Sequence, residues 1–280
     1  MREPAKTLEV KDYLVSGETF VLQFDTHKTL ARTQLKEGLN LADYYPAEDY
    51  TSHQEKRLGI RGMLYGLVQR FMLHYKLSIL KKHQAEKDLL DIGGGIGVFA
   101  QFLAKHGYDV ALTEPNPNAR KLAQKKGLSC FSSVDEIPMN ASYSCLSLWH
   151  VLEHVNALET SLQKYHNAIK NNGLMLVAVP NLASFDAAYY GPYWAAYDVP
   201  RHLWHFTPQG LQERVETQGF RLLKTYPLWF DSFYISILSE TYANNKFAFL
   251  RGLFVGLYSN IRALFSQEYS SKIFVFQKLT

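Results

Sequence analysis

The stretch Leu89-Leu90-Asp91-Ile92-Gly93-Gly94-Gly95-Ile96-Gly97 decides the fold, because it joins an apolar strand, a glycine turn and the start of a helix. Leu89 to Ile92 is short and apolar, as expected of a buried strand. The helix is expected to run to His106, where Gly107 takes the C-cap position. Glycines in such a turn let the backbone approach a ligand closely, so we expect a ligand site at the end of this strand.

The residues around the glycines indicate which ligand binds there. A dinucleotide fingerprint needs its third glycine at position 98, where Val98 stands, and this disfavours a pyrophosphate. Asp91 would repel a pyrophosphate but suits a ligand that carries an ammonium and a sulfonium. Glu114 ends the second expected strand, where a carboxylate can accept two hydrogen bonds from a ribose diol. The predicted cofactor-binding residues of this region are Asp91, Gly93, Gly94, Gly95, Gly97 and Glu114.

Strand and helix patterns alternate along the following residues. Repeated strand–helix units predict a parallel sheet with helices on both faces, so the fold class is α/β. Strands are expected at 108–113, 128–131, 143–149, 174–179, 220–226 and 272–278, and helices at 117–127, 157–170 and 208–219.

The regions on either side of these units define the expected organisation. Residues 1–57 are expected to be an irregular extension in which Phe20 to Phe24 forms a short strand, while helical spacing of apolar residues predicts one long amphipathic helix over 58–85. The domain of 86–280 then carries two inserts. The insert 183–206 is rich in aromatic residues and is expected to contact the substrate, and the insert 234–266 is expected to be helical.

Three stretches together resemble class I S-adenosylmethionine-dependent methyltransferases. They are the glycine stretch with Glu114, the run Trp149-His150-Val151-Leu152-Glu153-His154-Val155 and the run Arg201-His202-Leu203-Trp204-His205-Phe206-Thr207. Over about 87–226 the chain is similar to the ubiquinone-biosynthesis-type group of small-molecule methyltransferases. The resemblance implies a Rossmann-like sheet, mostly parallel with an antiparallel last strand, an N-terminal helical extension and a C-terminal helical insert.

The resemblance also implies a cofactor and roles for individual residues. S-adenosyl-L-methionine is the expected cofactor, with Asp91 and the glycines at its methionine end and Glu114 at its ribose. One of the residues Ser132, Ser133 and Val134 is expected to line the adenine, and Ser133 is taken here. Trp149 and His150 are expected to lie near the methyl donor.

Four histidines are candidates for a general base, which a hydroxyl acceptor would need. They are His150, His154, His202 and His205. His150, Glu153 and His154 also spell the HxxEH pattern of a zinc peptidase, but the pattern begins at the end of an expected strand. Cys130 and Cys145 form no CxxC pair either, so we expect no metal.

Charge and hydropathy indicate the partners. The net charge is +4 and the basic residues are scattered, which disfavours nucleic acid and favours a small-molecule substrate, with O-methylation as one outcome. Methylation of tRNA or protein, and non-catalytic cofactor binding for regulation, remain open as alternatives. The apolar stretch Phe249 to Phe265 is expected to be a lid or dimer helix over the sheet rather than a membrane-surface helix. Met1 to Val10 lacks the apolar run of a secretion signal, so a cytoplasmic protein is expected.

Overall fold

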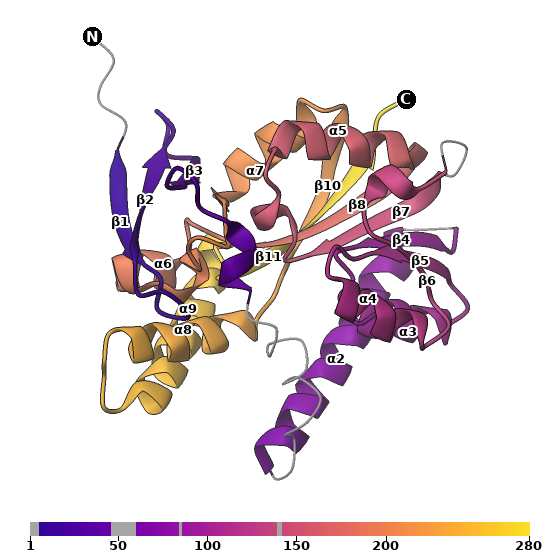
Figure 1. Cartoon of the computed structure of the whole chain (residues 1–280). Coiled ribbons are helices and arrows are strands. Elements are labelled where there is room, and N and C mark those ends of the chain that lie inside the picture. Colours follow the sequence, from indigo (N-terminus) through magenta and orange to yellow (C-terminus); the bar gives the residue numbers. More distant parts are fainter. Residues whose placement is uncertain (1–5, 46–59, 84–85, 139–141) are drawn as a thin grey trace.

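A seven-stranded sheet forms the centre of the computed structural model, which describes residues 6–45, 60–83, 86–138 and 142–280 (Figure 1). The strand order is β10-β11-β8-β7-β4-β5-β6. Strands β8, β7, β4, β5 and β6 are parallel, while β11 is antiparallel to both of its neighbours. The predicted mostly parallel sheet with an antiparallel last strand is therefore confirmed. The strands are β4 (Asp88–Ile92), β5 (Asp109–Thr113), β6 (Ser129–Phe131), β7 (Tyr143–Trp149), β8 (Ile169–Pro180), β10 (Phe220–Pro227) and β11 (Ser271–Lys278).

Helices cover both faces of this sheet, because neighbouring strand residues point to opposite sides. Leu146 of β7 packs in one core with helices α5 and α7, whereas Cys145 packs in another core with α2 and α3. Most of these helices lie close to where the sequence predicts them. Their bounds are α2 (Ile60–His83), α3 (Val98–Ala104), α4 (Pro117–Gln124), α5 (Leu158–Ala168) and α7 (Pro208–Glu216).

A second, antiparallel sheet corrects the predicted N-terminal extension. The described residues 6–45 are neither irregular nor a helical extension. The strands β1 (Thr7–Lys11), β2 (Thr19–Phe24) and β3 (Leu30–Gln34) pair in order ahead of a 3-10 turn at Leu41–Tyr44, and β2 confirms the predicted strand at Phe20 to Phe24. A fourth strand, β9 (Trp204–Phe206), completes the sheet from far along the chain. Residues 1–5 and 46–59, also part of the predicted extension and helix start, lie outside the described residues.

The aromatic insert is ordered and links the two sheets. It contains α6 (Phe185–Tyr190), two short 3-10 turns and β9. Trp194 is 2% exposed and packs with Tyr197 and the N-terminal sheet in a third core. The long segment that looks irregular in sequence is therefore held in place by its own buried rings.

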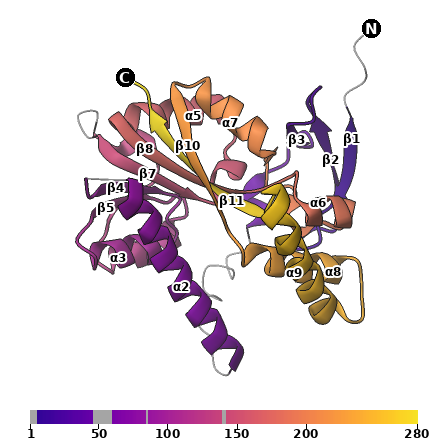
Figure 2. The same ribbon diagram turned by 180° about the vertical axis from the view of Figure 1, so that it is seen from behind.

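The C-terminal insert is a pair of packed helices, α8 (Asp231–Tyr242) and α9 (Ala248–Ser266). Figure 2 shows the pair at one end of the molecule, beside α6 and away from α3. The apolar residues of α9 do not cover the sheet as expected, since α9 lies against α8 and α6. Among the described helices, none is long and apolar enough to cross a membrane.

Candidate functional site

The glycine turn between β4 and α3 has the backbone geometry that its sequence predicts. Gly93, Gly95 and Gly97 have φ angles of +64°, +58° and +74°, a region in which glycine is strongly favoured. Gly94 N–H donates to Thr113 O at 2.9 Å, which ties the turn to β5. A Cβ on Gly97 would lie 2.4 Å from Leu128 Cδ1, whereas a Cβ on Gly95 would meet nothing within 4 Å. The turn is packed from behind and open over Gly95, as a cofactor cradle requires.

The two predicted acids lie on either side of this turn. Asp91 is 1% exposed, and Ser147 Oγ donates to its Oδ1 at 2.5 Å. Burial raises the pKa of Asp91 to about 6, opposed by the Ser147 hydrogen bond and by Lys76. Glu114 accepts from Gly95 N–H at 2.9 Å and from Asn116 N–H at 2.8 Å. Burial raises the pKa of Glu114 and these two bonds lower it, so the carboxylate also organises the turn.

Lys76 is a site residue that the sequence analysis missed. It comes from α2, and its Nζ lies 3.9 Å from the centroid of the Trp149 ring. Burial lowers the pKa of Lys76 to about 8, opposed by the charges of Asp91 and Asp231. The sequence does contain a hint of this role: Lys76 is a charged residue within the apolar stripe of α2 that also contains the buried Ile79 and Leu80.

Trp149 and Ser133 occupy the two ends of the predicted cofactor region. The Trp149 indole packs edge-on against Phe99, and its buried Nε1–H has no protein partner among the described residues. Ser133 follows β6, and its Oγ accepts from Asp135 N–H at 3.2 Å at the start of a 3-10 turn. Contact of Ser133 with an adenine stays a prediction.

His150 sits between two carboxylates at the end of β7. Its backbone is left-handed (φ +55°), and its Nδ1 and Nε2 lie 3.2 Å from Glu153 Oε1 and 3.1 Å from Asp231 Oδ2. Burial lowers the pKa of His150, but the hydrogen bonds to Asp231 and Glu153 outweigh it and raise the pKa to about 10. His150 is therefore a cation at neutral pH that donates from both nitrogens, and it is a poor general base. Both nitrogens of His150 thus face carboxylates, and the expectation that His150 and His154 hold no metal stays a prediction.

The other three candidate histidines form a row in which His202 lies between His154 and His205. The ring centroids of His154 and His202 are 4.6 Å apart, and those of His202 and His205 are 6.5 Å apart. Burial and the neighbouring His202 lower the pKa of His154 to about 4 and that of His205 to about 3. The row thus contains two imidazoles that stay neutral near neutral pH.

Hydrogen bonds fix how His202 and His205 present their nitrogens. His202 Nδ1 donates to Ala196 O at 2.9 Å, so in the neutral ring the lone pair is on Nε2. The Thr33 hydroxyl donates to His202 O at 2.6 Å, so His205 Nε2 donates to Thr33 Oγ1 at 2.9 Å. His205 joins β9 to β3, while His202 keeps one nitrogen available.

A cavity of about 330 Å³ lies between the aromatic insert, α8 and the loop after β1. His150 and Asp231 line one part of it, and Asp198 and His202 line another, whereas His154 and His205 are absent from its wall. The remaining lining side chains are largely apolar: Leu14, Pro180, Ala195, Ala196, Tyr234, Ile235, Leu238, Tyr242 and Ser271.

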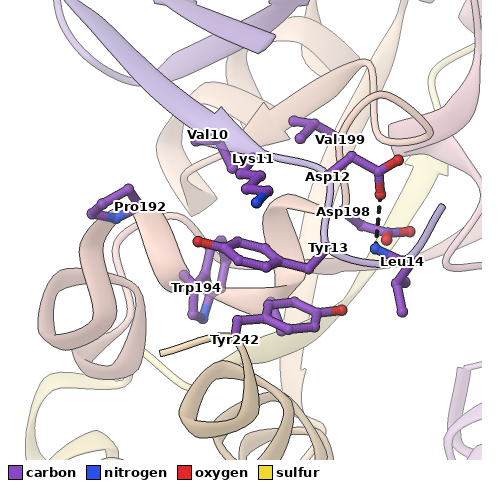
Figure 3. A pocket seen from close by; sticks show the side chains of 11 residues that line it. Val10, Lys11, Asp12, Tyr13, Leu14, Pro192, Trp194, Asp198, Val199 and Tyr242 are labelled. Carbon is purple, nitrogen blue, oxygen red and sulfur yellow. Dashed lines mark hydrogen bonds between the residues drawn. The ribbon is translucent and has the colours of Figure 1, made fainter. Parts of the chain in front are cut away.

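The loop after β1 borders this cavity through Leu14, and Figure 3 shows the loop at a second, smaller pocket, which it lines together with Trp194, Asp198 and Tyr242. Tyr13 stacks on Tyr242 of α8 with ring centroids 4.5 Å apart and planes 11° apart. Leu14 N–H donates to Asp12 Oδ1 at 2.9 Å, which fixes the turn that carries Leu14 to the cavity wall. The N-terminal sheet, of which the sequence predicts only the strand at Phe20 to Phe24, therefore supplies part of the site through the loop after β1.

Comparisons with known proteins agree with this geometry. A family model described as a methyltransferase domain matches residues 66–225, more than half of the chain. A ubiquinone biosynthesis O-methyltransferase of Azorhizobium caulinodans is 27% identical over 157 residues, which cover 51% of this chain and 62% of that protein. A protein of the same description from Rhodopseudomonas palustris is 31% identical over 144 residues, covering 47% and 57%. The chain thus spans less than two thirds of the length of either relative.

Solved structures share the fold at low identity. Magnesium protoporphyrin IX methyltransferase from Synechocystis PCC 6803, with bound S-adenosylhomocysteine, superposes with a TM-score of 0.56 at 11% identity, covering 84% of this chain and 97% of that one. A methyltransferase from Archaeoglobus fulgidus gives a TM-score of 0.51 at 17% identity, covering 82% and 99%. At these identities the likeness concerns the fold alone.

Proposed function

The chain belongs to the class I S-adenosylmethionine-dependent methyltransferase domain family, and on this premise we propose that it methylates a hydroxyl of a small molecule held in the 330 Å³ cavity. The volume lies at the lower end of the range of about 300–1,000 Å³ for small-molecule pockets. The curated relatives, whose names describe O-methyltransferases, support the choice of a hydroxyl.

The residues around the glycine turn fit the cofactor. The opening over Gly95 gives it room, the buried carboxylate of Asp91 suits its ammonium, and Glu114 keeps lone pairs for a ribose diol. Lys76 and the unpartnered indole N–H of Trp149 offer a cation and a donor for its carboxylate. When bound, S-adenosylmethionine supplies a methyl group on a sulfonium, which leaves as a neutral thioether.

One observation carries the assignment of the cavity. Asp231 lines the cavity, bonds His150 and also acts electrostatically on Lys76, which lies against Trp149 at the cofactor side. The same side chain thus belongs to the acceptor wall and to the cofactor surroundings. Methyl transfer requires the acceptor cavity and the cofactor region to adjoin, because the enzyme has to align the acceptor in line with the methyl donor.

His202 is the proposed general base. It lines the cavity, the hydrogen bond of its Nδ1 places the lone pair of the neutral ring on Nε2, and Asp198 Oδ2 lies 3.7 Å from that nitrogen. In this role His202 takes the hydroxyl proton as the oxygen–carbon bond forms, and Asp198 stabilises the resulting imidazolium. His150, already protonated, positions the acceptor instead.

The test compares His202→Gln with His27→Gln, a matched change at an exposed histidine of the N-terminal hairpin. With radiolabelled S-adenosylmethionine and a panel of phenols, catechols and aliphatic alcohols, the wild type should yield a product heavier by one methylene. His202→Gln should lower the rate about 10²–10⁴-fold with unchanged affinity for S-adenosylhomocysteine, and His27→Gln should change neither. Full activity of His202→Gln would remove the base from this assignment, and product formation only from amines would exclude a hydroxyl acceptor.

A further inference from the structure

Helix α9 exposes a continuous row of large apolar side chains. The residues recur with the spacing of one helix face, and we call this row the α9 seam. Patches of this kind on a protein surface mark sites of interaction. The seam consists of Leu250 (55% exposed), Phe254 (71%), Leu257 (48%), Ile261 (46%) and Leu264 (61%), with Phe265 (88%) beside its end.

The inner face of α9 explains why these side chains point outward. Gly252, Gly256, Ser259 and Ala263 are buried against the rest of the protein. A Cβ on Gly252 would lie 2.5 Å from the Cα of Ile237, so α9 approaches α8 too closely for a larger side chain. The helix cannot turn its large residues inward without losing this contact, and the seam is a fixed feature of the fold.

Basic residues border the seam. All the exposed charged residues of 231–266 are basic, namely Lys246, Arg251 and Arg262. The two acids of this segment face inward: Asp231 bonds His150, and Glu240 is 2% exposed and pairs with Arg251, whose Nε lies 3.3 Å from its Oε2. A second copy of α9 would add its own basic residues to this surface, whereas an anionic surface is complementary to them.

We propose that the α9 seam docks on the surface of a lipid bilayer that contains anionic lipids. An apolar helix face bordered by basic residues lies in the interface of such a membrane, with its apolar side chains among the acyl chains and its cations at the headgroups. The inference does not depend on the identity of the methyl acceptor. Docking nevertheless fixes where the acceptor cavity lies relative to the membrane. Helix α8 packs against α9 and supplies Ile235, Leu238 and Tyr242 to the cavity wall. Docking leaves the cavity one helix away from the lipid.

Co-sedimentation of the full chain with vesicles tests the proposal. Vesicles of phosphatidylcholine with 30 mol% phosphatidylglycerol are compared with vesicles of phosphatidylcholine alone, at about 0.15 M salt. Leu257→Glu places a charge in the seam, and Leu35→Glu is the matched control at an exposed leucine of the N-terminal region. Lys246→Gln/Arg262→Gln removes two of the three cations.

The wild type and Leu35→Glu should sediment with the anionic vesicles, and Leu257→Glu should remain in the supernatant. Each lost cation should weaken the partitioning of the chain onto anionic vesicles about fivefold. Vesicles of pure phosphatidylcholine should weaken the partitioning of the wild type by more than this, because they remove the attraction for all of its cations. Light scattering and circular dichroism of each variant establish that the chain is folded. Failure of the wild type to sediment, sedimentation unchanged by Leu257→Glu, or a dimer without vesicle binding that Leu257→Glu dissociates would each overturn the proposal.

Discussion

At the scale of single residues, Glu114 organises the glycine turn and is also proposed to hold the ribose, and comparing two substitutions separates these roles. Both of its oxygens accept a backbone N–H of the loops that they organise. Glu114→Gln keeps one acceptor and turns an amide NH₂ toward the second N–H, while Glu114→Ala loses both acceptors and the ribose contact. We expect affinity for S-adenosylhomocysteine to fall in both variants, by at least tenfold in Ala, because hydrogen bonds to charged groups contribute roughly 1.5–3 kcal/mol each. Calorimetric titration measures it.

The control for this prediction is Glu159→Gln, at an exposed acid of α5 on the opposite side of the sheet. It should bind like the wild type. Affinity of Glu114→Ala within twofold of the wild type would show that Glu114 does not hold the ribose.

His150 makes the stability of the fold depend on pH. Its pKa is raised from 6.5 to about 10 by Asp231 and Glu153, against the effect of burial. A group whose folded pKa is raised stabilises the fold fully below its unfolded pKa and loses that contribution as the pH rises through the folded value. The free energy of unfolding of the wild type should therefore exceed that of His150→Gln more at pH 6 than at pH 10.

Urea denaturation of both proteins at the two pH values measures this difference. Taking the difference cancels the titration of groups that do not interact with His150, so what remains reports His150 together with its partners Glu153 and Asp231. An equal difference at both pH values would mean that His150 is not held as a cation.

At the scale of elements, two glycines of the turn should affect different properties, Gly97 the stability of the fold and Gly95 the binding of the cofactor. Gly95 and Gly97 both have positive φ, so an alanine at either position is strained by roughly 1–2 kcal/mol. Gly97→Ala also meets Leu128, whereas the space over Gly95 is open. We expect Gly97→Ala to lower the melting temperature of the free protein more, and Gly95→Ala to lower cofactor affinity more.

Differential scanning fluorimetry without and with S-adenosylhomocysteine measures both quantities on the same samples. The reverse order of the two variants would place the cofactor elsewhere than over Gly95.

The elements that the sequence predicts well are those specified by neighbouring residues. Strand β4, the turn and α3 follow from a local apolar run and glycines, and the helix over 58–85 follows from its periodicity. Of the N-terminal sheet, the local sequence predicts only the strand at Phe20 to Phe24, because β3 gains its partner β9 only through folding: Leu30 pairs with Phe206. Short strands that depend on so distant a partner leave little local pattern.

The candidate site divides along the same line. Asp91, Glu114 and Trp149 come from strand ends in register, so motif spacing places them together. Lys76 and Asp231 belong to elements outside the motifs, and only the packing of α2 and α8 brings them in. The four histidines look equivalent in sequence, and the structure distinguishes them by their hydrogen-bond partners, by their burial and by whether they line the cavity.

At the scale of the whole molecule, cofactor binding should stabilise the native chain. A ligand at a hundredfold excess over its Kd adds about 2.7 kcal/mol if it binds only the folded state. With roughly 2–4 °C for each kcal/mol in chains of comparable size, S-adenosylhomocysteine should raise the melting temperature by about 5–10 °C. NAD should have no effect, because Val98 stands where the dinucleotide turn needs glycine. A response to NAD alone would contradict the assignment.

The position of β11 has a consequence for how the chain is made. The strand fills an interior place in the sheet, between β8 and β10, and β10 has no other partner strand there. During translation β10 is synthesised before the α8–α9 hairpin, and β11 is synthesised after it. The backbone groups of β10 that pair with β11 therefore have no partner strand until Ser271–Lys278 have been synthesised. At about 5–20 residues per second that interval lasts a few seconds, and in it a nascent chain carrying the α9 seam has not yet closed its sheet. The seven-stranded sheet is therefore completed only after the α8–α9 hairpin has been synthesised.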